Sequence, residues 1–213
     1  MRSYEKIKIY WDMDDVILDT SETLIYLINK RYNIPNNQEE KSVQDLKDWK
    51  LRSIYRDIPE SAIWEIVNSE EFWQRVSFKK GFISLFGSPI APYFTHVFVT
   101  IGSEENLENK QMFLSGSWKY LFKQQQPFCF IGLPPHSKKE DVDMSDGIQI
   151  DDNLKNLAHT NAKLKILVKN FLETDYNTFS EFKSFNIDNL YEVDTLYDIK
   201  KILQFILQHP QEF

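Results

Sequence analysis

Five short apolar segments, separated by stretches with helical periodicity, constrain the fold of this chain most strongly. The segments are residues 7–11, 96–100, 128–131, 147–150 and 164–168. Each has the length of a strand, and three of them end in acidic or hydroxyl side chains. Strands that alternate with helices form βαβ units, and such units build parallel sheets. We therefore predict an α/β fold with a Rossmann-like parallel sheet as its core.

The segment from residue 20 to residue 92 interrupts this alternation. It contains helical patterns without a convincing strand, at residues 21–32, 58–68 and 70–76. Beyond it, helical periodicity returns at residues 106–121 and 195–208. We therefore expect residues 20–92 to form a small helical cap that is inserted into an α/β core made of residues 1–19 and 93–213.

Composition excludes several classes of protein. Apolar residues make up 42% of the chain, which is enough for a hydrophobic core. The formal net charge of −7 opposes binding to a nucleic acid backbone, but a small anionic substrate is compatible with it if a bound cation reverses the local field. No apolar run approaches the roughly 18 residues that a membrane span needs. We therefore expect neither nucleic acid nor membrane as a partner.

The single cysteine and the start of the chain indicate a location. Cys129 excludes an intrachain disulfide and fits a reducing compartment. Residues 1–6 lack the apolar stretch of a signal peptide. These two features predict a cytoplasmic protein, and nothing in the sequence indicates its oligomeric state.

Polar residues follow three of the predicted strands. Asp12 and Asp14 follow the first strand, Thr100 ends the second, and Asp151 and Asp152 follow the fourth. In parallel α/β sheets the ligand binds beyond the carboxyl ends of the strands, so these side chains are expected at one edge of the sheet. Their order and strand context together predict a site, although each motif alone is more often a solvated turn or a helix cap.

Carboxylates in this arrangement suit a hard cation. Asp12 and Asp14 are two residues apart and project to the same side of an extended backbone. Together with Asp151 and Asp152 they supply the oxygen ligands that Mg²⁺ prefers. The predicted metal ligands are therefore these four aspartates, and the predicted cofactor is Mg²⁺. Lys138 or Lys139, in the loop before the fourth strand, would supply a cation for phosphate.

These residues resemble the motifs of the haloacid dehalogenase superfamily of phosphohydrolases. The segment 10–18 is similar to its first motif, Thr100 to the second, Lys138 or Lys139 to the third, and residues 150–152 to the fourth. Asp-Met-Asp-x-Val, a helical insertion directly after it, and Ile-Asp-Asp-Asn further resemble the 5′(3′)-deoxyribonucleotidase family. This narrower resemblance extends to Trp49 and to Glu71-Phe72-Trp73 in the predicted cap.

The resemblance implies a catalytic scheme. Asp12 would attack phosphorus and form an aspartyl-phosphate, and Asp14 would protonate the leaving oxygen and later activate water. Thr100 and one of the two lysines would hold the phosphoryl oxygens. One position departs from the family pattern, because the residue after the second aspartate is usually glycine and is Asp15 here.

The implied substrate is a small phosphorylated molecule, a nucleoside or deoxynucleoside monophosphate. Trp49, Phe72 and Trp73 could stack on its base, or could form the core of the cap instead. Two other functions remain open at this stage. The chain could be a phosphatase of the same fold for another small phosphoester, or a catalytically idle binding protein.

Overall fold

The computed structural model describes residues 6–36, 38–46, 54–122, 127–169 and 188–210. Within them, six parallel strands form one sheet in the order β3-β2-β1-β4-β5-β6. The strands are β1 (Ile7–Trp11), β2 (Phe94–Ile101), β3 (Phe128–Leu133), β4 (Gly147–Asp151), β5 (Leu164–Val168) and β6 (Leu190–Val193). The predicted α/β fold with a Rossmann-like parallel sheet is therefore confirmed.

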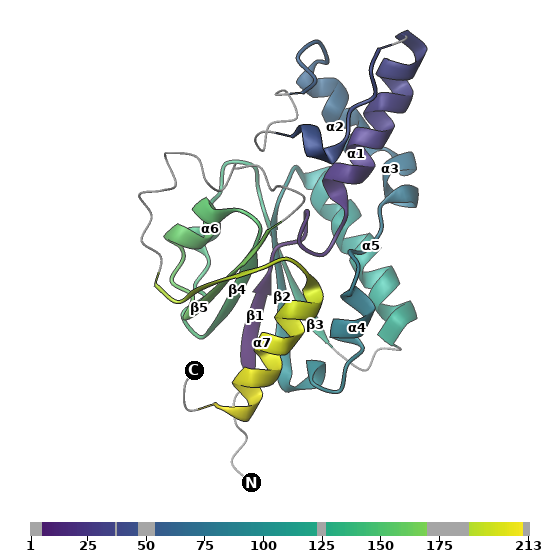
Figure 1. Ribbon diagram of the computed structural model, residues 1–213. Helices are drawn as coiled ribbons and strands as arrows, with labels where there is room; N and C mark the ends of the chain where they lie inside the picture. Colours follow the sequence, from purple (N-terminus) through teal and green to yellow (C-terminus); the bar gives the residue numbers. More distant parts are fainter. Residues whose placement is uncertain (1–5, 37, 47–53, 123–126, 170–187, 211–213) are drawn as a thin grey trace.

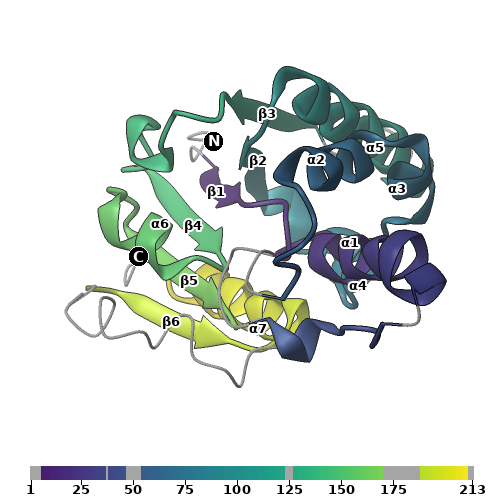
Figure 2. The same ribbon diagram turned by 90° about the horizontal axis from the view of Figure 1, so that it is seen from above.

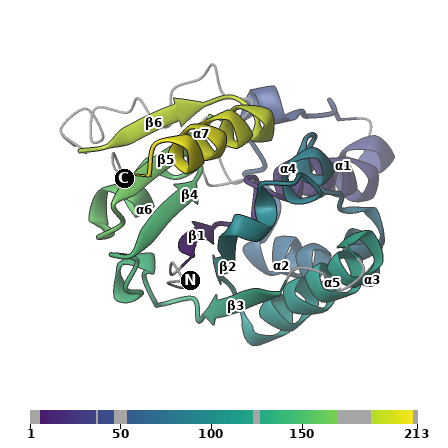
Figure 3. The same cartoon turned by 90° about the horizontal axis from the view of Figure 1, so that it is seen from below.

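Helices cover the two faces of the sheet unequally (Figures 2 and 3). One face carries α4 (Phe82–Phe86), α5 (Glu104–Phe122) and α7 (Leu196–Gln208), and the other carries α6 (Leu154–His159). The connection from β3 to β4 contains a short 3-10 turn, Lys139–Asp141, where a βαβ unit would have a helix. This shorter connection brings a lysine to the edge of the sheet, as described below.

Aromatic side chains fill the space between the sheet and the α4–α5 layer. The ring of Trp11 in β1 lies 4.9 Å from that of Phe86, and Phe86 lies 5.2 Å from Trp118 of α5. Phe98 in β2 completes the cluster at 5.5 Å from Trp118. Because Trp11 is fully buried in this cluster, the residues that follow it are held firmly at the end of β1.

The cap lies beyond the carboxyl ends of the strands (Figure 1). Its helices are α1 (Thr20–Ile28), α2 (Glu60–Asn68) and α3 (Glu70–Arg75), and α1 contacts both of the others. The chain enters and leaves the cap side by side, because Leu18 forms an antiparallel bridge with Phe78. Helix α4 lies inside the range expected for the cap, but it packs against α7 of the core.

The five predicted strands are confirmed, and the sequence pattern missed three short elements. These are the strand β6 and the helices α4 and α6, which have four to six residues each. The predicted helix 21–32 ends earlier, at Ile28, and continues as a π turn. No helix in the described parts of the chain is both long and apolar enough to cross a membrane.

Candidate active site

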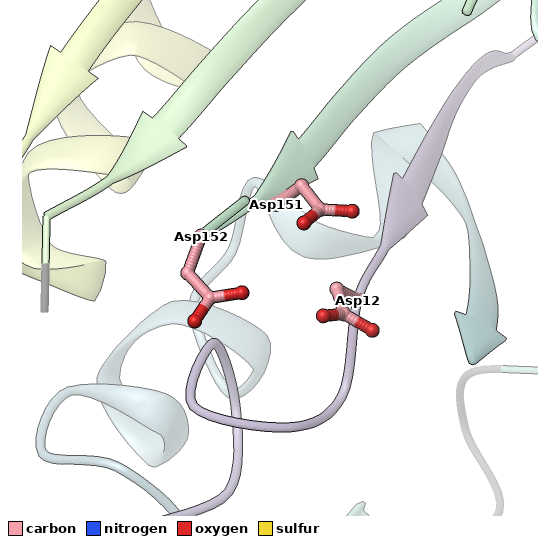
Figure 4. A group of neighbouring side chains, drawn as sticks. All are labelled: Asp12, Asp151 and Asp152. Atoms are coloured by element: carbon pink, nitrogen blue, oxygen red, sulfur yellow. The ribbon is translucent and has the colours of Figure 1, made fainter. Parts of the chain in front are cut away.

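The carboxyl ends of β1 and β4 lie next to each other, because these strands are neighbours in the sheet. Asp12 directly follows β1, and its backbone N–H donates to the carbonyl of Ile150 at 2.9 Å, which extends the pairing by one residue. Asp151 ends β4, and Asp152 follows it. Figure 4 shows the three carboxylates gathered at the ends of the two strands. One oxygen from each lies within 4.8 Å of the others.

Lys139 is the cation of this cluster. Its Nζ lies 2.7 Å from Oδ1 of Asp12 and 2.7 Å from Oδ2 of Asp151, and only 4% of its side chain is exposed. Lys138 points away, because its side chain is 73% exposed and pairs with Glu140. The structure thus brings Lys139 to the carboxylates and leaves Lys138 at the surface.

Asp151 and Asp152 occupy different surroundings. Besides Lys139, the carboxylate of Asp151 accepts hydrogen bonds from the backbone N–H of Asn153 at 2.9 Å and from Nδ2 of Asn156 at 3.1 Å. These donors fix both of its oxygens. Asp152 is equally buried, and burial together with the charges of Asp12 and Asp151 raises its pKa well above the ordinary value.

Burial has the largest effect on the electrostatics of the cluster, and the neighbouring carboxylates add to it. Burial raises the pKa of Asp12 to about 7, and the neighbouring charges of Asp151 and Asp14 add to this effect while Lys139 opposes it. Burial acts against the charged form of Lys139, but Asp12 and Asp151 outweigh it and raise the lysine pKa. One ammonium group therefore compensates only part of the charge of three buried carboxylates.

Asp14 belongs to a second cluster beside the first. Its Oδ1 accepts a hydrogen bond from Oγ1 of Thr20 at 2.9 Å, and its Oδ2 accepts one from Nζ of Lys110. Lys110 also donates to Oγ1 of the fully buried Thr100 at 2.8 Å. Four metal ligands were expected, and the structure groups three of them while Asp14 pairs with Lys110.

Lys110 is the site residue that the sequence analysis missed. It is one of five buried residues that repeat every four positions along α5: Asn106, Lys110, Leu114, Trp118 and Phe122. Their spacing places them on one side of the helix. The apolar members of this stripe could have revealed Lys110, since a lysine on the inward side of a helix is rarely buried without a partner.

Asp15 adopts a left-handed backbone conformation, with φ at 54°. This explains why glycine suits the position, and aspartate is one of the few residues that tolerate it. The carboxylate accepts hydrogen bonds from the backbone N–H of Ser21 at 2.9 Å and from its hydroxyl. Burial raises the pKa of Asp15 to about 6, against the opposing effects of Lys79 and Ser21. Asp15 therefore connects the loop after β1 to the first turn of α1.

The three predicted pocket aromatics have different positions. Trp49 lies outside the described residues. Phe72 is 1% exposed and is part of the hydrophobic core. Trp73 packs against Phe72 at 5.2 Å and against Phe113 of α5 at 5.8 Å, and its buried Nε1 has no hydrogen-bond partner among the described residues. Phe72 thus lies in the main hydrophobic core, and Trp73 lies where the cap meets α5.

The acidic cluster fits a magnesium ion. Three carboxylates of Asp12, Asp151 and Asp152 converge from two strand ends, and hard oxygen donors of this kind are the ligands that Mg²⁺ prefers. The pKa values of Asp12 and Asp152 are raised, first by burial and then by the neighbouring carboxylates, so the ionised cluster is unfavourable with Lys139 as its cation. A divalent cation would supply the missing positive charge.

Comparison with known proteins gives structural similarity only. No protein-family model and no curated protein matches the chain. Among solved structures, a predicted phosphatase from Clostridium acetobutylicum is 15% identical with a TM-score of 0.59, covering 96% of this chain and 100% of that one. CbbY from Rhodobacter sphaeroides, solved with phosphate, is 13% identical with a TM-score of 0.56, covering 92% and 96%.

A third similar structure is a haloacid dehalogenase-superfamily hydrolase from Geobacter sulfurreducens, at 10% identity and a TM-score of 0.55. It covers 93% of this chain and 100% of that one. The chain has the fold of these hydrolases. At such identities the similarity concerns the fold, and the chemistry of the site depends on the residues described above.

The raised carboxylate pKa values predict how stability depends on pH. Asp12 and Asp152 bind protons more tightly in the folded state than in the unfolded state, because both pKa values are raised. For Asp12 this contribution to stability is lost as the pH rises through its folded-state pKa of about 7. We expect the melting temperature of the metal-free protein to fall from about pH 5 to about pH 8. Mg²⁺ should raise it more at the higher pH, because the ion binds the ionised carboxylates.

Differential scanning fluorimetry in EDTA and in excess Mg²⁺ measures both effects. The double variant Asp12→Asn/Asp152→Asn is the control, and it should lose the stabilisation by Mg²⁺. Equal stabilisation at both pH values, or stabilisation that persists in the double variant, would contradict a metal site on these carboxylates.

Proposed function

We propose that this protein is a magnesium-dependent phosphomonoesterase that forms an aspartyl-phosphate on Asp12. The observation that carries the proposal is the buried cluster of Asp12, Asp151, Asp152 and Lys139 at the ends of β1 and β4. Asp14 and Thr100, which lie beside it, support the proposal because they supply an acid–base group and a hydroxyl donor. The similarity in fold to a predicted phosphatase, and to a protein solved with bound phosphate, adds further support.

The reaction needs two displacements at phosphorus. In the first, a carboxylate oxygen of Asp12 attacks phosphorus, the bond to the leaving oxygen breaks, and Asp14 donates a proton to that oxygen. In the second, Asp14 takes a proton from water as the water attacks the same phosphorus. The bond between Asp12 and phosphorus then breaks, and inorganic phosphate and the free carboxylate are released.

The remaining residues bind and orient the phosphoryl group. The hydroxyl of Thr100 and the ammonium group of Lys139 would each donate a hydrogen bond to a phosphoryl oxygen. Bound Mg²⁺ would neutralise charge that develops on the phosphoryl group. We assign metal ligation to Asp12, Asp151 and Asp152, because one oxygen from each lies within 4.8 Å of the others.

For the substrate we propose a nucleoside monophosphate, with deoxyribonucleotides as the class to test first. Asp-Met-Asp-x-Val, Ile-Asp-Asp-Asn and the helical insertion between them support this choice through their resemblance to 5′(3′)-deoxyribonucleotidases. The position of Trp73 between the cap and α5 is compatible with it. Another small phosphoester remains the second candidate, since one similar structure is a candidate phosphoglycolate phosphatase from Lactobacillus delbrueckii.

Replacing the nucleophile tests the reaction. We expect Asp12→Asn to lower the release of phosphate from p-nitrophenyl phosphate at least about 1000-fold, because the amide cannot attack phosphorus. The control is Asp57→Asn, the same change at an exposed position of the cap. Activity that survives in Asp12→Asn would remove Asp12 as the nucleophile. Wild-type protein that releases no phosphate in excess Mg²⁺ would favour a binding protein.

Lys138 and Lys139 are adjacent, so the same substitution at each gives a test variant and its control. We expect Lys139→Met to lower kcat/KM about 100-fold, since it removes the buried ammonium group that faces Asp12. Lys138→Met should remain within about twofold of wild type, because its side chain is at the surface. Phosphate release measures both variants, with melting temperatures to confirm folding. The reverse ranking would mean that Lys138 holds the phosphate.

A substrate panel tests the class of leaving group. We expect kcat/KM for deoxyribonucleoside and ribonucleoside monophosphates to exceed that for 2-phosphoglycolate and sugar phosphates by at least about tenfold, if the cap binds a nucleoside. The measurement is phosphate release at equal concentrations of each ester. Equal rates across the panel would refute the nucleotidase assignment and leave the phosphohydrolase assignment intact.

A further inference from the structure

Helix α5 places a buried ammonium group against the second aspartate of the first motif. Lys110 is 2% exposed, and its Nζ donates to Oδ2 of Asp14 and, at 2.8 Å, to Oγ1 of Thr100. The Nζ of Lys110 also donates to the backbone carbonyl of Ile101 at 3.4 Å. The three acceptors come from the loop after β1 and from the end of β2, so Lys110 joins the two strand ends that carry Asp14 and Thr100.

Asp12 and Asp14 therefore each pair with a different lysine. Asp12 pairs with Lys139, which comes from the turn before β4, and Asp14 pairs with Lys110, which comes from α5. The two lysines approach from different elements, and within the described residues no ion pair shorter than 4 Å joins either lysine to the other's aspartate. Lys110 thus acts on a different group from the one that Lys139 serves.

The surroundings of Asp14 explain why a fixed partner matters. Its side chain is 34% exposed, compared with 11% for Asp12, so packing restrains it less. Its two oxygens have different partners, one being Thr20 at the start of the cap and the other Lys110 of α5. Without Lys110, Oδ2 of Asp14 would lose this donor from the core, and the side chain could turn toward solvent.

We propose that Lys110 is a positioning residue that holds Asp14 where it exchanges protons with the leaving oxygen and with water. The inference rests on the proposed phosphohydrolase function and extends it to a residue outside the four motifs. A lysine that only stabilised the fold would be an unfavourable choice, because the cost of burying an ammonium group is repaid by an ion pair only when the geometry is excellent. Its placement against Asp14 and Thr100 indicates a role in the site.

Leaving groups of different basicity distinguish this role from a structural one. p-Nitrophenolate leaves without a proton, whereas the alkoxide of an alkyl phosphate requires one. The value of kcat/KM reports the steps up to transfer of the phosphoryl group to Asp12, and it therefore isolates the first use of Asp14. Loss of correct positioning should affect the alkyl ester strongly and the aryl ester weakly.

The test compares Lys110→Met, Asp14→Asn and the double variant on p-nitrophenyl phosphate and on an alkyl phosphate that the wild-type protein hydrolyses. We expect Lys110→Met to lower kcat/KM about 100-fold for the alkyl ester and less than about fivefold for the aryl ester. In the Asp14→Asn background, the same change should cost less than about threefold, because a residue that acts through Asp14 has nothing left to position.

Lys119→Met is the matched control, since Lys119 is an exposed lysine of the same helix. If Lys110→Met fails to fold, the double variant still decides the question, because it leaves no charge without a partner. Equal losses on both esters, no loss on the alkyl ester, or a further large loss in the Asp14→Asn background would each overturn the inference. A wild-type protein that hydrolyses neither ester would overturn the proposed function, and the inference with it.

Discussion

The contact of Lys139 with Asp12 and Asp151 is the interaction on which the site depends. Parallel pairing of β1 with β4 brings the acidic ends of the two strands together, although burial of their carboxylates is unfavourable. Burying each carboxylate costs several kcal/mol unless opposite charge compensates it. Lys139 bridges one carboxylate from each strand at 2.7 Å, so it stabilises the junction of the strands as well as the charges. Because a single ammonium group faces three carboxylates, the same arrangement that allows the fold to form also favours a divalent cation.

Much of this arrangement could be predicted from the sequence, for a physical reason. Strands buried on both faces of a parallel sheet are continuous apolar runs, and the polar residue that ends such a run marks the edge where ligands bind. Asp12, Thr100 and Asp151 were found in this way. The choice between Lys138 and Lys139 could not be made, because adjacent residues point to opposite sides and only the local turn decides which side faces the site. Here the side chain of Asp141 accepts from the backbone N–H of Lys138, and this turn directs Lys139 inward.

Lys110 shows a different limit of sequence analysis. It lies ten residues beyond Thr100, in a helix, with no motif of its own. Its function depends on how the first turns of α5 lie over the ends of β1 and β2, which is a property of tertiary packing. The periodicity of α5 shows which side of the helix faces inward, but it does not show that the inward side passes from the apolar core at Trp118 to the polar site at Lys110. A buried polar residue that continues an apolar stripe marks such a transition.

Asp15 connects the chemistry of the site to the cap. Glycine would meet the need for a positive φ at this position with less strain, so the aspartate side chain must compensate through its contacts. It does so at Ser21, while its neighbour Asp14 contacts Thr20, so two consecutive carboxylates hold two consecutive residues at the start of α1. Any movement of α1 relative to the core must therefore break these three hydrogen bonds or carry the loop after β1 with it. Since that loop also contains Asp12, the position of the cap and the geometry of the nucleophile and its acid–base partner are mechanically linked.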